Sequence, residues 1–338
     1  MKKNLTTILQ YFIFLGLGIF LAWWSLKDLN HDQKSQIRIA LSHARYWLII
    51  PVFAILIASH LIRALRWKLL ISSLGYKPRT ANSFFAVMIG YLTNLAVPRL
   101  GEIVKCTLLA RYEKVPADKL IGTIILERVI DALTLLLIFA ITFAIQPGLY
   151  ADLVNAFFHS PHDPSKKRIS GFLIAAILII AVAAGLLLWM VIKRKTVNDV
   201  IALFRRIGKS VWQGLSAVQH LKKRGLFLIY TFALWFFYLL GTYVGFYALK
   251  ETQQYGIKEA FAILSAGSVG MIVTPGGIGA YALLIKKTAE VYGLEEGIAL
   301  AFGWILWIVQ TFVILIGGIF SFAAIPYFNK RKKIPEPA

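Results

Sequence analysis

An interrupted apolar segment constrains this chain more than any other feature. Residues 81–97 are apolar, and Pro98, Arg99, Gly101 and Glu102 follow directly. Proline lacks a backbone donor and disfavours helical geometry in the residue before it, so a helix must stop here. Inside a membrane, charges and irregular backbone are tolerated where protein or a wet cavity surrounds them. Such a break is typical of a transporter binding site; a kinked helix whose charges reach one interface is the alternative.

The composition indicates whether the chain folds in water or in a membrane. It is 58% hydrophobic and 16% charged, whereas soluble domains have about 25% charged residues. We therefore expect an all-α polytopic membrane protein. The net charge of +21 then indicates basic cytoplasmic loops and contact with anionic lipids, and not nucleic-acid binding. A single cysteine, Cys106, excludes an internal disulfide, and we expect neither a metal site nor a cofactor.

Six stretches are long enough for a full crossing: residues 5–26, 47–65, 120–145, 171–192, 225–249 and 298–325. The first is too long for a signal peptide, so we expect it to be retained. Residues 37–47 have the spacing of a short interfacial helix, and residues 147–169 have the composition of an external loop. Arg63, Arg66 and Lys68 predict a cytoplasmic end for the second span.

Residues 1–326 are expected to form one membrane domain, with both termini at the inner face of the cytoplasmic membrane. Residues 193–224 predict a basic amphipathic helix on the inner leaflet or, alternatively, a solvated linker. Residues 327–338 predict a basic cytoplasmic tail.

A second interruption resembles the first. Thr274, Pro275, Gly276, Gly277 and Gly279 break an apolar stretch over residues 261–292. In each case the arm is too short to cross, which predicts two re-entrant hairpins, the first over 81–114 and entered from the cytoplasm.

The two interruptions also suggest an internal repeat. Pro98 and Pro275 are 177 positions apart, and the same offset aligns Gly90 with Gly267. Six crossings and two hairpins would make the halves, about 47–146 and 224–323, an inverted repeat whose broken segments meet near the midplane.

The charged residues near the first break have the chemistry of a lipid headgroup site. Arg99 and Arg128 can hold phosphate through the bidentate guanidinium group, and glycine-rich breaks let amides approach an anion. Glu127 and Asp131 are four apart and share a helix face. With Glu102, they either hold the arginines, bind a headgroup amine or exchange protons; purely structural pairing is the alternative.

Three motifs carry a family resemblance: Asn94-Leu-Ala-Val-Pro-Arg-Leu-Gly-Glu102, Glu127-Arg-Val-Ile-Asp131 and Thr274-Pro-Gly-Gly-Ile-Gly279. Together they resemble the signatures of the lysylphosphatidylglycerol synthase transmembrane-region family, which includes the flippase-like, stand-alone YbhN-like (UPF0104) membrane proteins. The resemblance covers nearly the whole chain and implies a membrane protein that moves or presents a lipid. Some members of the family carry a synthetase domain fused to the membrane region. For those members, the resemblance implies that the membrane region translocates the aminoacylated phosphatidylglycerol that the synthetase domain makes.

This sequence departs from that family pattern in two ways. Only a short basic tail follows the last span, so we expect no lipid aminoacylation by this chain. Ala282 stands where the family pattern leads us to expect an acid, and Lys105 is the repeat-related position. The absence of that acid puts the family's own substrate in question for this chain.

The sequence thus predicts a non-enzymatic lipid flippase without a nucleotide-binding motif. Its transport would be passive, driven by an ion or proton gradient, or powered by a partner. Its expected cargo is an anionic or zwitterionic lipid, such as a phospholipid, an aminoacyl-phospholipid or a polyprenyl phosphate. One alternative is a lipid-modifying transferase, with Glu127 or Asp131 as base, or the accessory subunit of a separate synthetase or glycosyltransferase. The other is a non-catalytic lipid-binding scaffold.

Overall fold

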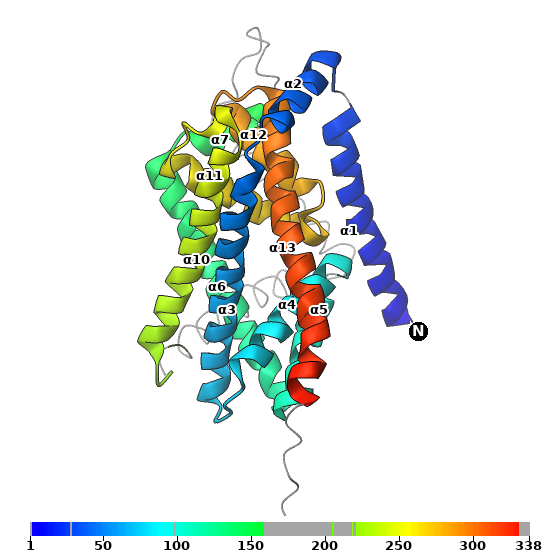
Figure 1. Ribbon diagram of the computed structural model, residues 1–338, viewed down its shortest axis with the longest axis vertical. Helices are drawn as coiled ribbons and strands as arrows, with labels where there is room; N and C mark the ends of the chain where they lie inside the picture. The colour runs from blue at the N-terminus through cyan, green and yellow to red at the C-terminus, as the bar shows by residue number, and fades with distance from the viewer. Residues whose placement is uncertain are drawn as a thin grey trace, which may run out of the picture. The chain divides into compact units, whose positions relative to one another are not determined.

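The computed structural model describes residues 2–27, 29–97, 99–158, 205, 218 and 221–330. Every regular element in these ranges is a helix (Figure 1). The chain divides into two compact units, Met1–Arg128 with Leu221–Ala338, and Val129–His220. The predicted span 171–192, most of the basic linker 193–224, Pro98 and the tail after residue 330 lie outside the described residues.

Three long helical stretches in the described residues are apolar enough to cross a membrane: Tyr46–Ser73, Arg224–Ala248 and Glu296–Lys330. They contain α3 (Ile49–Ser73), α10 (Arg224–Gly245) and α13 (Glu296–Lys330), and they confirm the predicted helices at 47–65, 225–249 and 298–325. Helix α3 packs along α10 and also contacts α13. Helix α1 (Lys2–Lys27) covers the predicted first span.

The second unit contains a helix where a loop was predicted. Helix α6 (Ala117–Ile145) covers the predicted span 120–145, and α7 (Leu149–Phe158) follows after a bend of 97°. Tyr150 stacks on Phe143 at 6.2 Å between ring centroids and donates a hydrogen bond to the Phe139 carbonyl at 3.1 Å. The loop prediction is therefore wrong over 149–158, because these residues form an apolar helix, α7, that packs back onto α6.

The predicted interfacial helix lies earlier than expected. Helix α2 covers His31–Ser42, and a short 3₁₀ turn, Tyr46–Leu48, leads into α3. The Asn30 side chain accepts from the Gln33 amide, and the Gln33 side chain accepts from the Asn30 amide. This capping box sets the start of the helix, so the predicted start at residue 37 is wrong.

The first broken segment forms the predicted hairpin. Helix α4 (Thr80–Ala96) and helix α5 (Leu100–Glu113) pack against each other. Val97 is extended and Arg99 is left-handed, with φ 67°, so the helical path ends between them. The two helices touch backbone to backbone, since a Cβ atom on Gly101 would overlap the Gly90 carbonyl oxygen.

The second broken segment has the same plan. Helix α11 (Ile257–Val273), the 3₁₀ turn Pro275–Gly277 and helix α12 (Ala280–Val291) follow one another. Gly276, Gly277 and Gly279 have φ values of 60°, 73° and 71°, a region that favours glycine. Helices α4 and α11 each contain 17 residues, and they begin 177 positions apart, at Thr80 and Ile257.

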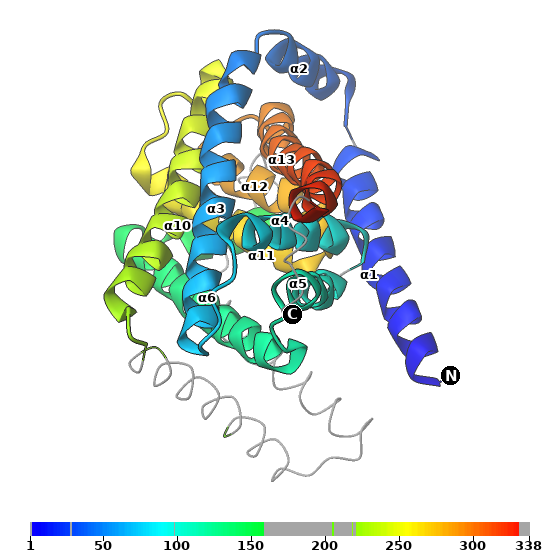
Figure 2. The same ribbon diagram turned by 60° about the horizontal axis from the view of Figure 1, so that its bottom comes forward.

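The two hairpins open toward opposite ends of α13 (Figures 1 and 2). At one end, Glu113 of α5 accepts from Arg79 and Asn82, which also bind Asn329 near the end of α13. At the other end, Lys286 of α12 binds Glu296, the first residue of α13. The tips meet between these ends, because a Cβ atom on Gly276 would lie 2.8 Å from Leu95 Cδ2.

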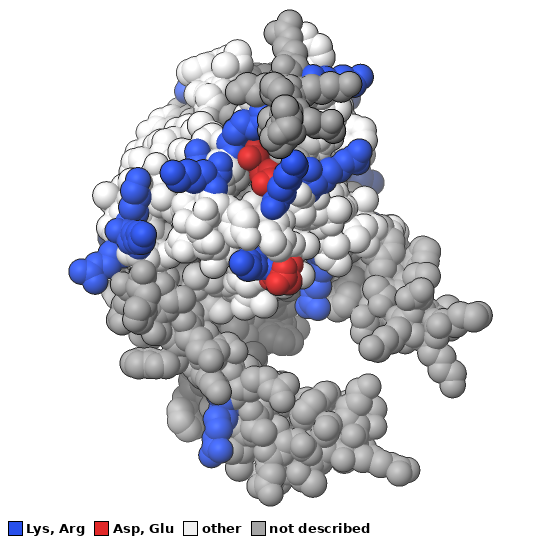
Figure 3. Space-filling model, turned by 90° about the horizontal axis from the view of Figure 1, so that it is seen from below, with Lys and Arg blue, Asp and Glu red and all other residues white. Residues whose placement is uncertain are grey.

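The two ends of α13, with the helix ends around them, differ in charge. The end where α4 begins and α13 ends is rich in lysine and arginine (Figure 3); its basic residues include Lys77, Arg79, Lys114, Lys119, Lys222, Lys223 and Lys330. The opposite end carries both signs of charge, since Glu290, Glu295 and Glu296 lie there beside Lys286 and Lys287. The basic end is the one toward which the first hairpin opens.

We expect Gly101→Ala to destabilise the first hairpin. The added methyl group has no room against the Gly90 carbonyl, and overpacking of this kind costs about 1–3 kcal/mol or more. The matched control is Gly122→Ala in α6, where a Cβ atom meets nothing within 4 Å. The apparent melting temperature of the purified protein should fall for the first variant and hold or rise for the second. Equal melting temperatures would contradict the close helix contact.

Candidate functional site

A buried carboxylate organises the charged residues of the first unit. Glu127 of α6 is 1% exposed. Among the described residues, three cations bind it: Arg63 at 3.1 Å, Arg66 at 3.4 Å and Lys105 at 2.9 Å. Arg63 and Arg66 are three apart on α3, so they share one helix face. We call these four residues the inner cluster.

Neutral side chains hold the cations of the inner cluster in place. Arg63 donates to the Tyr238 hydroxyl at 3.1 Å, and Arg66 donates to Thr231 at 3.4 Å, both on α10. The Lys105 ammonium lies 4.0 Å from the centre of the Trp67 ring. These contacts tie α3, α5, α6 and α10 to a single carboxylate.

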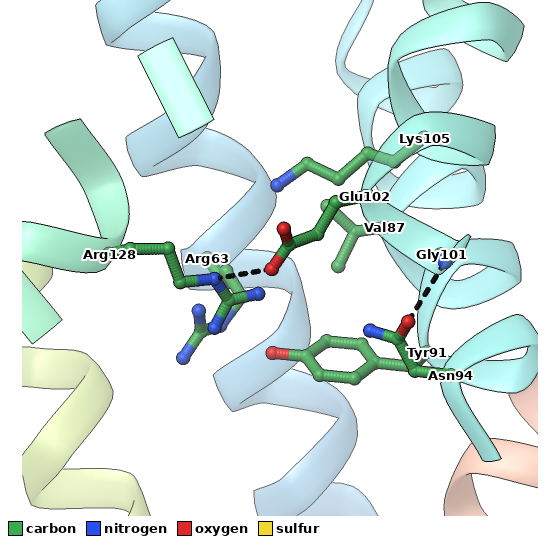
Figure 4. A pocket seen from close by; sticks show the side chains of 9 residues that line it. Arg63, Val87, Tyr91, Asn94, Gly101, Glu102, Lys105 and Arg128 are labelled. Carbon is green, nitrogen blue, oxygen red and sulfur yellow. Dashed lines mark hydrogen bonds and ion pairs between the residues drawn. The ribbon is translucent and has the colours of Figure 1, made fainter. Parts of the chain in front are cut away.

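A pocket adjoins the inner cluster at the tip of the first hairpin (Figure 4). About 250 Å³ of empty space, which includes space open to the outside, lies at its lining residues. They come from α3, α4, α5 and α6: Arg63, Val87, Gly90, Tyr91, Asn94, Gly101, Glu102, Lys105 and Arg128. Three of these residues are cations and one is a carboxylate, so the described lining favours an anion.

A second ion pair lies at the more exposed side of this pocket. Arg128 Nε is 2.9 Å from Glu102 Oε1, and their side chains are 46% and 34% exposed. We call Glu102 and Arg128 the outer pair. Figure 4 shows Arg128 reaching Glu102 across the pocket, with Arg63 behind it. Arg128 is thus more accessible than the cations of the inner cluster.

The predicted residues of the first break have different positions. Asn94 lines the pocket, and its side-chain oxygen accepts a hydrogen bond from the Gly101 amide at 2.8 Å. This bond gives a partner to one of the backbone N–H groups that have none within the first turn of α5. Arg99 is exposed and is not among the pocket residues. Asp131 belongs to the second unit, and Pro98 lies outside the described residues.

The glycine-rich break is packed against other helices. Trp307 of α13 donates to the Gly276 carbonyl at 2.8 Å, and Thr274 donates to the Ile278 carbonyl at 2.9 Å. A Cβ atom on Gly279 would overlap the backbone of Ala22 in α1. Pro275 and Gly277 are buried. None of the predicted residues 274–279 lines the pocket at the first hairpin.

Ala282 lies at a close helix crossing. It is fully buried, and a Cβ atom on Gly303 of α13 would lie 2.6 Å from its carbonyl oxygen. The position where an acid was expected therefore serves helix packing in this chain. Lys105, its repeat-related counterpart, binds Glu127 instead.

The sequence interpretation missed two central residues. Arg63 and Arg66 were predicted to form a cytoplasmic edge, but they are 6% and 0% exposed and bind Glu127. The two side chains therefore do not form an exposed basic edge, because a buried acid 61 to 64 residues away recruits both of them. The cytoplasmic end of this span stays a prediction. Their three-residue spacing within an apolar helix was the available signal.

These observations define a helical integral membrane protein with a cationic pocket beside a broken helix. The chain belongs to the lysylphosphatidylglycerol synthase transmembrane-region family, which it matches over residues 8–318. A UPF0104 membrane protein of Methanocaldococcus jannaschii is 31% identical over 86 residues, which cover 25% of this chain and 26% of that protein. The match thus spans about a quarter of that relative's length. No solved structure matches the chain.

We expect Glu127→Gln to destabilise the protein strongly. The change removes the carboxylate that Arg63, Arg66 and Lys105 share, and breaking a buried ion pair costs about 3–5 kcal/mol. Glu102→Gln is the matched control, since an exposed pair contributes about 1 kcal/mol or less. Thermal unfolding in detergent should separate the two variants. Similar losses for both would contradict the central role of Glu127.

Proposed function

We propose that the chain is a flippase-like membrane protein that moves or presents a lipid with an anionic or zwitterionic headgroup. The pocket at the tip of the first hairpin carries this proposal. Arg63, Lys105 and Arg128 face it, beside the interruption between α4 and α5. Arginine binds phosphate through two parallel hydrogen bonds, and every phospholipid or polyprenyl phosphate supplies such a group.

The arrangement of the hairpins supports transport. They open toward opposite ends of α13, and their tips meet at Leu95 and Gly276. We propose that residues 47–146 and 224–323 form an inverted repeat with two re-entrant hairpins. Residues 5–26, 120–145 and 171–192 then complete six crossings with the three long helical stretches. Opposed hairpins around one site are the usual basis of alternating access.

The charge asymmetry supports an orientation. Lysine and arginine collect on the cytoplasmic side of membrane proteins, and the basic end of this unit is the one where α4 begins and α13 ends (Figure 3). We propose that this end and both termini face the cytoplasm, in the cytoplasmic membrane. The first hairpin would then open inward and the second outward.

A non-enzymatic role agrees better with the surroundings of Glu127 than a role as a general base. Its two oxygens accept from three cations, and a general base must instead accept a proton from its substrate. We therefore propose that membrane lipids are the partners, and that any lipid chemistry belongs to a separate synthetase or glycosyltransferase.

Reconstituted proteoliposomes test transport directly. The wild-type protein should equalise a fluorescent phosphatidylglycerol or a polyprenyl phosphate between the leaflets, whereas Arg128→Gln should slow the rate at least about tenfold. The reason is that a hydrogen bond to a charged group contributes about 1.5–3 kcal/mol. Arg111→Gln, on the exposed side of α5, is the control and should retain the rate.

Two results would reject transport. If the wild-type protein changes the leaflet distribution of none of these lipids, the flippase function is wrong. If it binds lipid tightly under the same conditions without moving it, the lipid-binding scaffold is the better description.

A further inference from the structure

We propose that the outer pair forms a lateral entrance to the pocket. In this proposal the phosphate of a lipid arrives sideways from the membrane, between α5 and α6, and replaces Glu102 as the partner of Arg128. The lipid tails remain outside, on the apolar surfaces of the two helices. The inference rests on the proposed function and adds the route and the residue that receives the headgroup.

The first observation is the difference between the two layers of charge. Glu127 is 1% exposed and bound by three cations, so the carboxylate of the inner cluster is closed to a ligand. The outer pair is a single contact of 2.9 Å between side chains that are 46% and 34% exposed. An exposed pair is worth about 1 kcal/mol or less, so a ligand can separate Arg128 from Glu102 at small cost.

The second observation is the apolar surface around the outer pair. Ile121, Ile125 and Arg128 follow helical spacing along α6, and both isoleucines are more than half exposed. On α5, Ile103 and Leu100 are exposed next to Glu102. In a membrane, exposed isoleucine and leucine on these helices face lipid tails. The outer pair therefore interrupts a lipid-facing surface, which is where a headgroup with attached tails would enter.

The third observation is that an exchange of partners would leave each charge near an opposite charge. A phosphate on Arg128 would occupy the same pocket as Arg63, a second guanidinium group (Figure 4). The released Glu102 would remain one helical turn from Lys105, which also lines the pocket. No carboxylate has to be left alone in a medium of low dielectric constant, where an isolated charge is costly.

The entrance predicts opposite effects for its two residues. We would measure binding of dioctanoyl phosphatidic acid and of inorganic phosphate to the purified full chain in detergent. The wild-type protein should bind the lipid at least tenfold more tightly than inorganic phosphate. Glu102→Gln should tighten lipid binding about threefold or more, because Arg128 no longer has to leave a carboxylate. Arg128→Gln should weaken binding at least tenfold.

Melting temperatures separate a change in lipid binding from a loss of folding. Both variants should melt within a few degrees of the wild-type protein. If both weaken binding and both lower the melting temperature, the outer pair is structural and the proposal is wrong. If inorganic phosphate binds as tightly as the lipid, the site takes a soluble anion and the lateral route is wrong.

A cross-link tests the route with the outer pair intact. Ile103→Cys and Ile125→Cys place thiols on the exposed surfaces of α5 and α6, while the chain's single native cysteine, Cys106, is buried. Bridging the two new thiols with a bifunctional reagent should abolish lipid binding, and each single-cysteine variant treated alike should bind normally. Normal binding by the bridged protein would overturn the lateral entrance.

The binding measurements and the proteoliposome measurements fail separately. If the variants and the bridge change binding as expected but the wild-type protein moves no lipid, the proposed function is wrong and the entrance stands as a binding route. If the wild-type protein moves lipid while the variants and the bridge have no effect, only the entrance is wrong.

Discussion

The first unit depends on the attraction between Glu127 and the three cations around it. A carboxylate buried in a helical membrane protein is costly on its own, and here Arg63, Arg66 and Lys105 offset that cost within 3.4 Å. Lys105 reaches Glu127 because α5 lies against α4, with Gly101 packed on Gly90. The break in the apolar segment is thus what allows the second arm of the hairpin to bring a cation to the acid.

Local signals explain what could be predicted from the sequence. Proline and glycine act on their own backbone, so the interruptions near residue 98 and at 274–279 lie where the residues indicate. The lengths of the apolar runs are also a local signal, and they predict α3, α10 and α13. The capping box at Asn30 was also a local signal, and using it would have corrected the start of α2.

The remaining features depend on contacts that are distant in the chain. Arg63 and Arg66 look like an interfacial edge until Glu127, more than 60 residues later, is placed beside them. Arg99 and Arg128 are equally suited to phosphate by residue type, yet only Arg128 faces the pocket. Which face of a helix a charge occupies follows from its sequence spacing, but the neighbour that face meets is a property of the fold.

The two hairpins share a backbone plan but divide the chemistry between them. The first contributes Glu102 and Lys105, whereas the second contributes glycines packed against α1 and α13 and a buried Ala282. The Leu95 side chain lies against Gly276 where the two tips meet, so the charges that line the pocket and the glycine turn of the second hairpin are neighbours. This division of roles accounts for the likeness of the two hairpins in helix length and in the position of the break, and for their difference in residue identity.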